Sequence, residues 1–528
     1  MNKVNNNHQN HMMKGALVLS VAAFITKVLS ALYKVPFQNL TGDEGFYVYQ
    51  QIYPLYGIAV ALSLNGLPLF ISKLVAEETE TSKQQLIIKQ IGLWLMIISF
   101  TLFVFFWLGA SWIAEKMGDE ELLPVIRSVS YIYLFIPFLS SIRGFFQGNL
   151  DMVPTGISQV GEQIARILVL LGAAYTYTIT DWTVYQMGSI ALSSSWIAGI
   201  VGSVILFWYV FHRAEKKDTS KVFDKQNFFE IGRRLMAEGL PLTAMSSMMV
   251  LFQLLDSFTI YNGLIESGIS EQMAMSLKGI YDRGQPFVQL GLVVGLGIST
   301  SALPLLRKYS RENKKEEWEK ISFTVLNLTF LFSGAASVGL IAIMPWLNHA
   351  LFSDEAGTGV LRIYVISILL ASMISSTLSI LQSKTNRMLP LIALLIGLMV
   401  KASINQFAVK HLGIMGSSYL TIFSLFIVLL LMNSQMPKKI WIKFLEDRKI
   451  FKILITLIIM GGITYLTLKG LELIFPLMGR AVSLVLTFIG TFFGGVIFIK
   501  GLMLFDLLSE QEWQYIPFKE KFSRFRNE

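Results

Sequence analysis

Runs of apolar residues recur along the whole chain, and short polar links separate them. A helix needs about 20 apolar residues to cross a hydrocarbon core of ~30 Å. The pattern therefore predicts an all-α polytopic membrane protein with fourteen transmembrane helices. They are expected at residues 13–33, 46–70, 86–110, 122–147, 157–179, 184–211, 235–262, 273–305, 321–349, 358–382, 388–409, 412–435, 450–474 and 481–506.

The charges of the links predict the orientation. "HRAEKKDTSKVFDKQNFFEIGRR" holds seven Lys or Arg residues and "RKYSRENKKEEWEK" holds six, whereas "FSDEAGTG" and "NGLIESGISEQ" hold none. Basic links stay on the cytoplasmic side of a membrane. We therefore expect both termini in the cytoplasm and the chain in a cell membrane.

Two predicted helices resemble each other. Residues 45–74 read "GFYVYQQIYPLYGIAVALSLNGLPLFISKL" and residues 279–309, most of which fall in the predicted helix 273–305, read "GIYDRGQPFVQLGLVVGLGISTSALPLLRKY". Each stretch has a Gly and an aromatic residue first, then a Pro, then small residues, and finally "LPL" before a basic end. Helices six spans apart that run the same way indicate a parallel repeat of two six-helix lobes. A chance coincidence of residues common in membrane helices is the alternative.

This repeat predicts the domain organisation. The segments are a polar tail (1–12), an N-lobe (13–212), a basic linker (213–234), a C-lobe (235–436), two appended helices (437–506) and a cytoplasmic tail (507–528).

Composition narrows the function. The chain is 53% hydrophobic and 15% charged, and it has no cysteine, which excludes disulfides, thiolate metal sites and cysteine nucleophiles. No phosphate-binding loop motif occurs, so ATP hydrolysis by this chain is not expected. Basic cytoplasmic links explain the net charge of +9 without a nucleic-acid partner. We expect no catalytic residues, no cofactor and no resident metal.

Ionisable residues inside the predicted helices are the candidate functional residues. Such a residue facing lipid costs about 3 kcal/mol, so it normally faces the bundle interior or water. Lys27 lies deep in the first helix, although an outward snorkel is an alternative. Lys401 is similarly deep in residues 388–409, and a structural pairing with a residue such as Asp256 is its alternative.

Two pairs of charges are candidates for a gate or for ion coupling. Glu162 and Arg166 are four residues apart, which suits either a local salt bridge or a gate that lines a cavity. Glu238 and Asp256 flank a Gly-Leu-Pro interruption, where an acid suits Na⁺ or H⁺ coupling. An inner-end position for Glu238 and a buried hydrogen bond for Asp256 are equally open.

Several other side chains are expected at the membrane surfaces. Tyr49, Tyr53 and Tyr56 share one helix face and predict an interfacial aromatic belt, with stacking on a sugar as the alternative. Arg127 and Arg143 lie near opposite ends of residues 122–147 and are expected to reach the two interfaces.

The dipeptide Asp282-Arg283 begins a charge-free stretch of twenty-three residues, 284–306. By length alone it suits the outer interface, whereas the repeat and the small residues around it favour the mouth of a cavity. Lys27 in one lobe and Arg283 in the other, with Asp282 to balance Arg283, suit an anionic substrate such as a diphosphate.

With these features, the chain resembles the MurJ-type lipid II flippases and their Gram-positive relatives, among them the stage V sporulation protein B type. These belong to the multidrug/oligosaccharidyl-lipid/polysaccharide (MOP) exporter superfamily. The residues that carry the resemblance are the basic residue deep in the first helix, "LSLNGLPLFISKLVAEE" and "YDRGQPFVQLGLVVGLGISTSALPLL".

The resemblance implies that Lys27 and Arg283 line a cationic cavity that receives the diphosphate of a lipid-linked glycan. A family cavity arginine is missing, since Asn65 and Gly66 stand in its place, and Lys34 is a candidate to compensate. A cation site known in some members would fall near Asp256. The implied substrate is a polyprenyl-diphosphate-linked glycan, first of all lipid II, and the implied partners are membrane lipids and cell-wall synthesis machinery. The implied driving force is membrane potential or Na⁺ or H⁺ exchange.

Four other functions remain open at this stage. The cargo could be a teichoic-acid or capsule intermediate, or the chain could be a multidrug antiporter of the same superfamily. A membrane-embedded glycosyltransferase is disfavoured by the short external loops. A non-transporting scaffold for cell-wall enzymes is the fourth.

Overall fold

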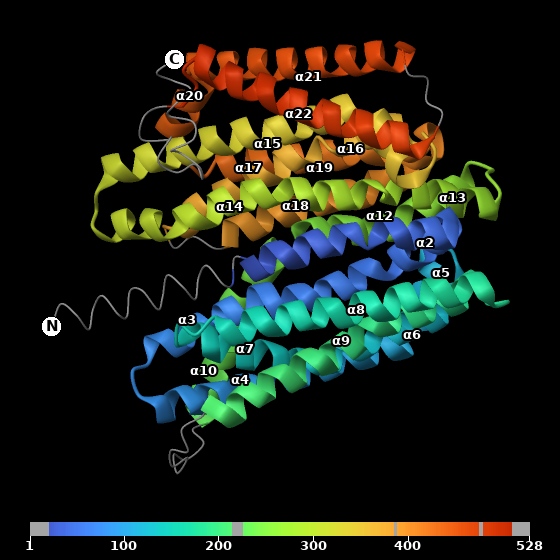
Figure 1. Ribbon diagram of the computed structural model, residues 1–528. Helices are drawn as coiled ribbons and strands as arrows, with labels where there is room; N and C mark the ends of the chain where they lie inside the picture. Colours follow the sequence, from blue (N-terminus) through green and yellow to red (C-terminus); the bar gives the residue numbers. More distant parts are fainter. Residues whose placement is uncertain (1–18, 20, 214–224, 385–387, 475–478, 509–528) are drawn as a thin grey trace. The chain divides into compact units, whose positions relative to one another are not determined.

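The computed structural model describes residues 19, 21–213, 225–384, 388–474 and 479–508 (Figure 1). Within these residues every regular element is helical, and thirteen helices are long and apolar enough to cross a membrane. The first of them, Val21–Glu77, spans 57 residues and holds residues 21–33 of the first predicted helix together with the whole of the second, 46–70. The all-α multi-pass fold is therefore confirmed, whereas the number fourteen and the orientation of the termini stay predictions.

The chain forms two compact units. Unit 1 comprises Met1–Asp282 and Leu398–Ser417, and unit 2 comprises Arg283–Gly397 and Ser418–Glu528. The units differ from the predicted lobes, because α11, α12 and α13 pack against the helices of residues 34–66 and so belong to unit 1. The lobes defined by the sequence repeat stay a prediction.

Unit 1 begins with a helical stretch over residues 21–32. Its further elements are α2 (Lys34–Val60), η1 (Ala61–Gly66), α3 (Leu67–Glu77), α4 (Thr81–Leu108), α5 (Ala110–Met117), η2 (Glu120–Leu122), α6 (Leu123–Ser130), η3 (Tyr131–Phe135), α7 (Ile136–Gly148), α8 (Val153–Ile179), α9 (Val184–Arg213), α10 (Lys225–Arg234), η4 (Leu235–Gly239), α11 (Leu240–Ser246), α12 (Met248–Glu266) and α13 (Glu271–Asp282). The predicted linker 213–234 therefore ends in a helix, α10. The predicted tail 1–12 lies outside the described residues.

Unit 2 holds α14 (Gly284–Arg311), α15 (Lys315–Phe352), α16 (Thr358–Tyr364), α17 (Ser367–Gln382), most of α19 (Ile414–Asn433), α20 (Lys438–Glu446), α21 (Arg448–Ile474) and α22 (Arg480–Leu504). α18 (Met388–Leu412) is divided, with its first ten residues in unit 2 and the rest in unit 1. Of the predicted tail 507–528, only residues 507 and 508 are described.

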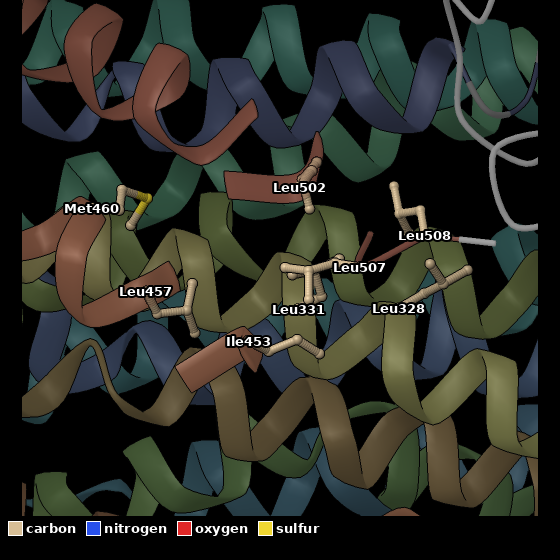
Figure 2. Close-up of a cluster of buried hydrophobic side chains, with 8 residues drawn as sticks. All are labelled: Leu328, Leu331, Ile453, Leu457, Met460, Leu502, Leu507 and Leu508. Atoms are coloured by element: carbon tan, nitrogen blue, oxygen red, sulfur yellow. The ribbon is translucent and has the colours of Figure 1, made fainter. Parts of the chain in front are cut away.

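The two predicted appended helices are α21 and α22, and both pack on α15. Figure 2 shows the apolar cluster that joins them. Its members are all buried: Leu328, Leu331, Ile453, Leu457, Met460, Leu502, Leu507 and Leu508.

Gly42 separates the first two predicted helices. Its backbone has φ 70° and ψ −177° inside α2, and the helix on each side is otherwise regular. A side chain at this position would meet no atom within 4 Å, so the demand for glycine is conformational and not steric.

Two Gly-Leu-Pro-Leu stretches, at residues 66–69 and 239–242, lie together in unit 1. A π-helical segment, η1 or η4, ends at the Gly of each. Proline cannot donate to the preceding turn and its ring crowds the carbonyl four residues earlier, which explains both distortions. A Cβ on Gly66 would collide with the backbone and side chain of Thr243, so the first stretch needs glycine for close helix contact.

Leu457→Ala is expected to lower the free energy of unfolding by about 2 kcal/mol, the lower end of the usual range for a buried leucine. Leu457 is 3% exposed in the cluster of Figure 2, so its loss leaves a void between α15 and α21. The adjacent Ile458 is 70% exposed, and Ile458→Ala is the matched control. Thermal unfolding of the purified protein in detergent measures both, and equal effects would contradict the packing.

Candidate functional site

The helix of residues 21–41 and the tyrosine-rich part of α2 surround a buried arginine from α8. Arg166 lies over the rings of Tyr56, Tyr33 and Tyr53, with its Cζ at 3.8, 5.3 and 5.5 Å from their centroids. It also donates hydrogen bonds to the hydroxyl oxygens of Tyr33, at 3.0 Å, and of Tyr49. We call Tyr33, Tyr49, Tyr53 and Tyr56 the tyrosine cage.

The spacing of the cage residues explains why they converge. Tyr49, Tyr53 and Tyr56 are four and three residues apart, which places them on one face of α2. The hydroxyls of Tyr33 and Tyr49 lie 2.7 Å apart. The predicted interfacial belt is wrong for these residues, because Tyr49 and Tyr53 are buried and only Tyr56 is partly exposed. A buried arginine on another helix is instead stabilised by the faces of their rings and by their hydroxyl oxygens.

Lys34 lies beside the cage. Its side chain is 0% exposed, and its ammonium lies 4.2 Å from the centroid of the Tyr53 ring. Among the described residues its Nζ has no hydrogen-bond partner, and Arg166 and Asp282 act on it electrostatically. Two buried cations thus share one aromatic ring.

Asp256 of α12 is the centre of a second polar cluster in unit 1. The ammonium of Lys401 lies 2.7 Å from its carboxylate, and Ser417 donates to the same oxygen at 2.8 Å. Asn405 and Tyr281 each donate to Asp256 at 3.2 Å. Both predicted alternatives, the Lys401–Asp256 pairing and the buried hydrogen bond of Asp256, are therefore confirmed.

Asp282 pairs with Lys278, one helical turn earlier in α13, at 2.6 Å. Lys278 thus balances Asp282, and the balance of Arg283 by Asp282 stays a prediction because the two residues belong to different units. Asp282 also acts electrostatically on Lys34 and Lys401, which links the cage to the Asp256 cluster.

Arg283 belongs to unit 2, where Asp354 holds it. Its two terminal nitrogens donate to the two carboxylate oxygens of Asp354 at 2.6 and 3.0 Å. Its guanidinium lies over the ring of Phe352, 4.9 Å from the centroid. Partial burial of Asp354 opposes its ionisation, but the bonds and charge of Arg283 outweigh that effect and lower the pKa of Asp354 below its ordinary 3.8.

The predicted local salt bridge between Glu162 and Arg166 is wrong. Glu162 instead pairs with Arg143 of α7. Arg143 is fully buried and also donates to the carbonyl oxygen of Ser63 at 3.0 Å and to the Ser158 hydroxyl at 3.2 Å. The expectation that Arg143 reaches an interface is therefore also wrong, because two neighbouring helical segments, η1 and α8, supply its acceptors.

Glu238 lies in η4, in a partly exposed ion network. Lys73 contacts it at 2.8 Å and Arg234 at 3.6 Å, and Arg234 also reaches Glu77 at 2.9 Å. Such exposed pairs each contribute about 0.2–1 kcal/mol to stability.

Lys27 is half-buried in the helix of residues 21–32. No described residue forms an ion pair or a hydrogen bond with it. It lies seven residues before Lys34, so the two lysines share a helix face about 10 Å apart. Whether Lys27 and Arg283 face one cavity stays a prediction, since they belong to different units.

Sequence reasoning missed Lys278, Asp354 and Thr243 as contact residues. The four-residue spacing of Lys278 and Asp282 was a usable signal. No local pattern pointed to Asp354, which is 71 residues from Arg283. Within the described residues, no group of three His, Asp or Glu side chains could hold a metal ion.

The fold resembles that of solved membrane transporters. The lipid II flippase MurJ in an inward closed conformation superposes with a TM-score of 0.68 at 15% identity, covering 93% of this chain and 98% of that one. A multidrug resistance MATE family transporter of the MOP superfamily, in an inward-facing conformation, gives 0.61 at 15% identity, with 80% and 98% covered. The chain is a multi-pass membrane protein with the MOP-superfamily transporter fold.

The chain belongs to the polysaccharide biosynthesis protein family, whose pattern matches residues 12–310. The membrane protein YabM of Bacillus subtilis is 34% identical over 517 residues, covering 97% of this chain and 96% of YabM. The lipid II flippase MurJ of the same organism is 26% identical, with 76% and 77% covered. Its stage V sporulation protein B is 25% identical, with 81% and 83% covered. The resemblance drawn from the sequence motifs is thus confirmed.

Lys401→Met and Asp256→Asn are each expected to lower the free energy of unfolding by about 3 kcal/mol, because each leaves a buried charge unpaired. The double variant removes both charges and is expected to recover much of that loss. Thermal unfolding of all four proteins completes the cycle. Additive losses would show that the two charges do not interact.

The Arg283–Asp354 pair is expected to weaken in acid. Since the pKa of Asp354 is lowered in the folded protein, its stabilising contribution is present above pH 3.8. It is lost as the pH falls from 3.8 through the folded-state value. Asp354→Asn is expected to be less stable at pH 7 than the wild type. Its unfolding temperature is expected to fall less between pH 5 and pH 3. An identical pH profile in both proteins would contradict the pairing.

Proposed function

We propose that this protein is a flippase that moves a polyprenyl-diphosphate-linked cell-wall precursor, first of all lipid II, from the inner to the outer leaflet. The observation that carries the proposal is the excess of buried cations in unit 1. Among the described residues of unit 1, the buried cations are Lys34, Arg143, Arg166, Lys278 and Lys401, whereas the buried carboxylates are Asp119, Asp256 and Asp282. A diphosphate is the part of such a lipid that demands cations within the membrane.

The relatives support the same class of cargo. One is the lipid II flippase MurJ, and the matching family is described by polysaccharide biosynthesis. In this proposal the sugar and diphosphate cross between the two lobes by alternating access, and the polyprenyl tail stays in the lipid. Lys27, Lys34 and Arg283 line that route, and the proposal extends to cell-wall synthesis machinery as a partner.

Membrane potential or ion exchange supplies the driving force in this proposal. Asp256 already has an ammonium and three neutral donors on its carboxylate. That arrangement favours membrane potential or proton transfer over a Na⁺ held at Asp256, because a metal cation would compete with Lys401.

A flippase for a teichoic-acid or capsule intermediate is the second candidate. Asn65 and Gly66 favour it, since they stand where the lipid II flippases carry another cavity arginine. A multidrug antiporter for cations is less well supported, because unneutralised Lys34 and Arg166 would repel such a substrate.

Proteoliposomes that contain the purified protein and lipid II with a fluorescent headgroup provide the test. Lipid II is expected to become accessible to an external quencher at a rate that Lys27→Gln reduces about ten-fold, the loss expected for one charge-assisted contact to a phosphate. Lys469→Gln, at a half-exposed position in α21, is the matched control.

The same vesicles loaded with a teichoic-acid lipid intermediate separate the two candidates. Movement of that lipid but not of lipid II would reject lipid II as cargo. Movement of neither would reject the flippase proposal.

A further inference from the structure

We propose that Lys34 and Arg166 form an anion-binding site for a diphosphate group, and that the tyrosine cage holds the two cations until the anion arrives. The inference deepens the proposed function, on which it rests for the identity of the lipid. The anion chemistry itself follows from unit 1 alone.

Most buried cations of the described residues have a carboxylate partner. Six lysine and arginine side chains of the described residues are buried, and four of them have a carboxylate partner. Those four pairs are Arg143–Glu162, Lys278–Asp282, Arg283–Asp354 and Lys401–Asp256. Lys34 and Arg166 have no such partner among the described residues, and they are neighbours.

Aromatic rings hold these two cations. Both lie over the ring of Tyr53, Lys34 at 4.2 Å and Arg166 at 5.5 Å from its centroid. The Nζ of Lys34 and the Nε of Arg166 are buried without a hydrogen-bond partner in the described part of the chain. Aromatic faces and phenol oxygens attract a cation but leave its charge in place. Asp282 acts on Lys34 only from beyond ion-pair distance, so an anion would give these two adjacent cations the direct partner that they lack among the described residues.

The site offers an anion both a guanidinium and an ammonium group. A guanidinium presents a planar fork that matches two phosphate oxygens, and an ammonium supplies a point charge. Tyr33 and Tyr49 share a hydrogen bond and accept from Arg166, so their hydroxyl protons can turn toward an incoming oxygen. The site fits a group with several anionic oxygens and rejects a cationic substrate.

The two cations can leave the cage when an anion arrives. Neither cation has to break an ion pair to meet an anion, whereas Arg283 would have to leave Asp354. Lys34 has a flexible stem, and the partly exposed Tyr56 is the cage member nearest to Arg166. Lys27, on the same helix face two turns before Lys34, provides a further cation along the first helix.

The experiment measures anion binding by calorimetry with the purified full-length protein. The probes are inorganic pyrophosphate and a polyprenyl diphosphate in detergent micelles. Lys34→Gln and Arg166→Gln are each expected to weaken binding about ten-fold or more, because each removes a charge-assisted contact. Arg166→Lys keeps the charge but loses the fork, so it is expected to fall between wild type and Arg166→Gln.

Arg127→Gln is the matched control. Arg127 is another arginine of unit 1 over an aromatic ring, that of Trp107 at 4.9 Å, and it contacts none of the cage residues in the described structure. Its substitution is expected to leave binding unchanged. Should Arg166→Gln fail to fold, Lys34→Gln and Tyr53→Leu still test the site, since Tyr53 is the shared ring.

The outcomes separate the site from the cargo. Tighter binding of the polyprenyl form assigns the site to a lipid headgroup, and equal binding of both probes assigns it to free diphosphate. Wild-type binding that the Lys34 and Arg166 variants lose supports the site even when lipid II is not translocated. Unchanged binding in both variants, or no binding of either probe by the wild type, overturns it. Lipid II translocation at the wild-type rate in both variants overturns the site while leaving the flippase function intact.

Discussion

The free-energy cost of placing charges among membrane-spanning helices governs the interior of this protein. Removing one partner of a buried ion pair costs about 3–5 kcal/mol, because no water solvates the remaining charge. Arg143, Lys278, Lys401 and Arg283 accordingly each have a carboxylate, and two of these carboxylates, those of Glu162 and Asp354, come from partly exposed positions. The buried charges thus define which helices must lie together.

The Asp256 cluster shows how strongly such charges specify packing. Its donors come from α13, α18 and α19, and those of α18 and α19 include Asn405 and Ser417, 149 and 161 positions from Asp256. Apolar contacts between membrane helices discriminate weakly among registers, because lipid tails are as apolar as leucine. A carboxylate that needs four donors accepts one register only. The close approach of Gly66 to Thr243 complements this with a purely steric constraint.

Lys34 and Arg166 follow a different rule from the other buried cations. A cation–π contact contributes about 0.5–2 kcal/mol, which is less than the cost of disrupting a buried ion pair. Cations held by tyrosine rings are therefore more readily transferred to an anion than cations held by carboxylates. This difference relates the tyrosine cage to the proposed flippase function, and one relative of the chain is the lipid II flippase MurJ.

The spacing of apolar residues was sufficient to predict the all-α multi-pass architecture, because crossing a bilayer imposes a minimum helix length that is visible in any single sequence. The motifs around residues 65–68 and 281–286 were sufficient for the superfamily. Pairing predictions succeeded for Lys401 with Asp256, where few acids lay deep enough to be partners. They failed for Glu162 with Arg166, because helical spacing shows which side chains are near and not which distant helix offers a better partner. Local sequence determined where the charges are buried, whereas only the tertiary structure decided that Asp354, Glu162 and four tyrosines would receive them, since those contacts join residues up to 133 positions apart.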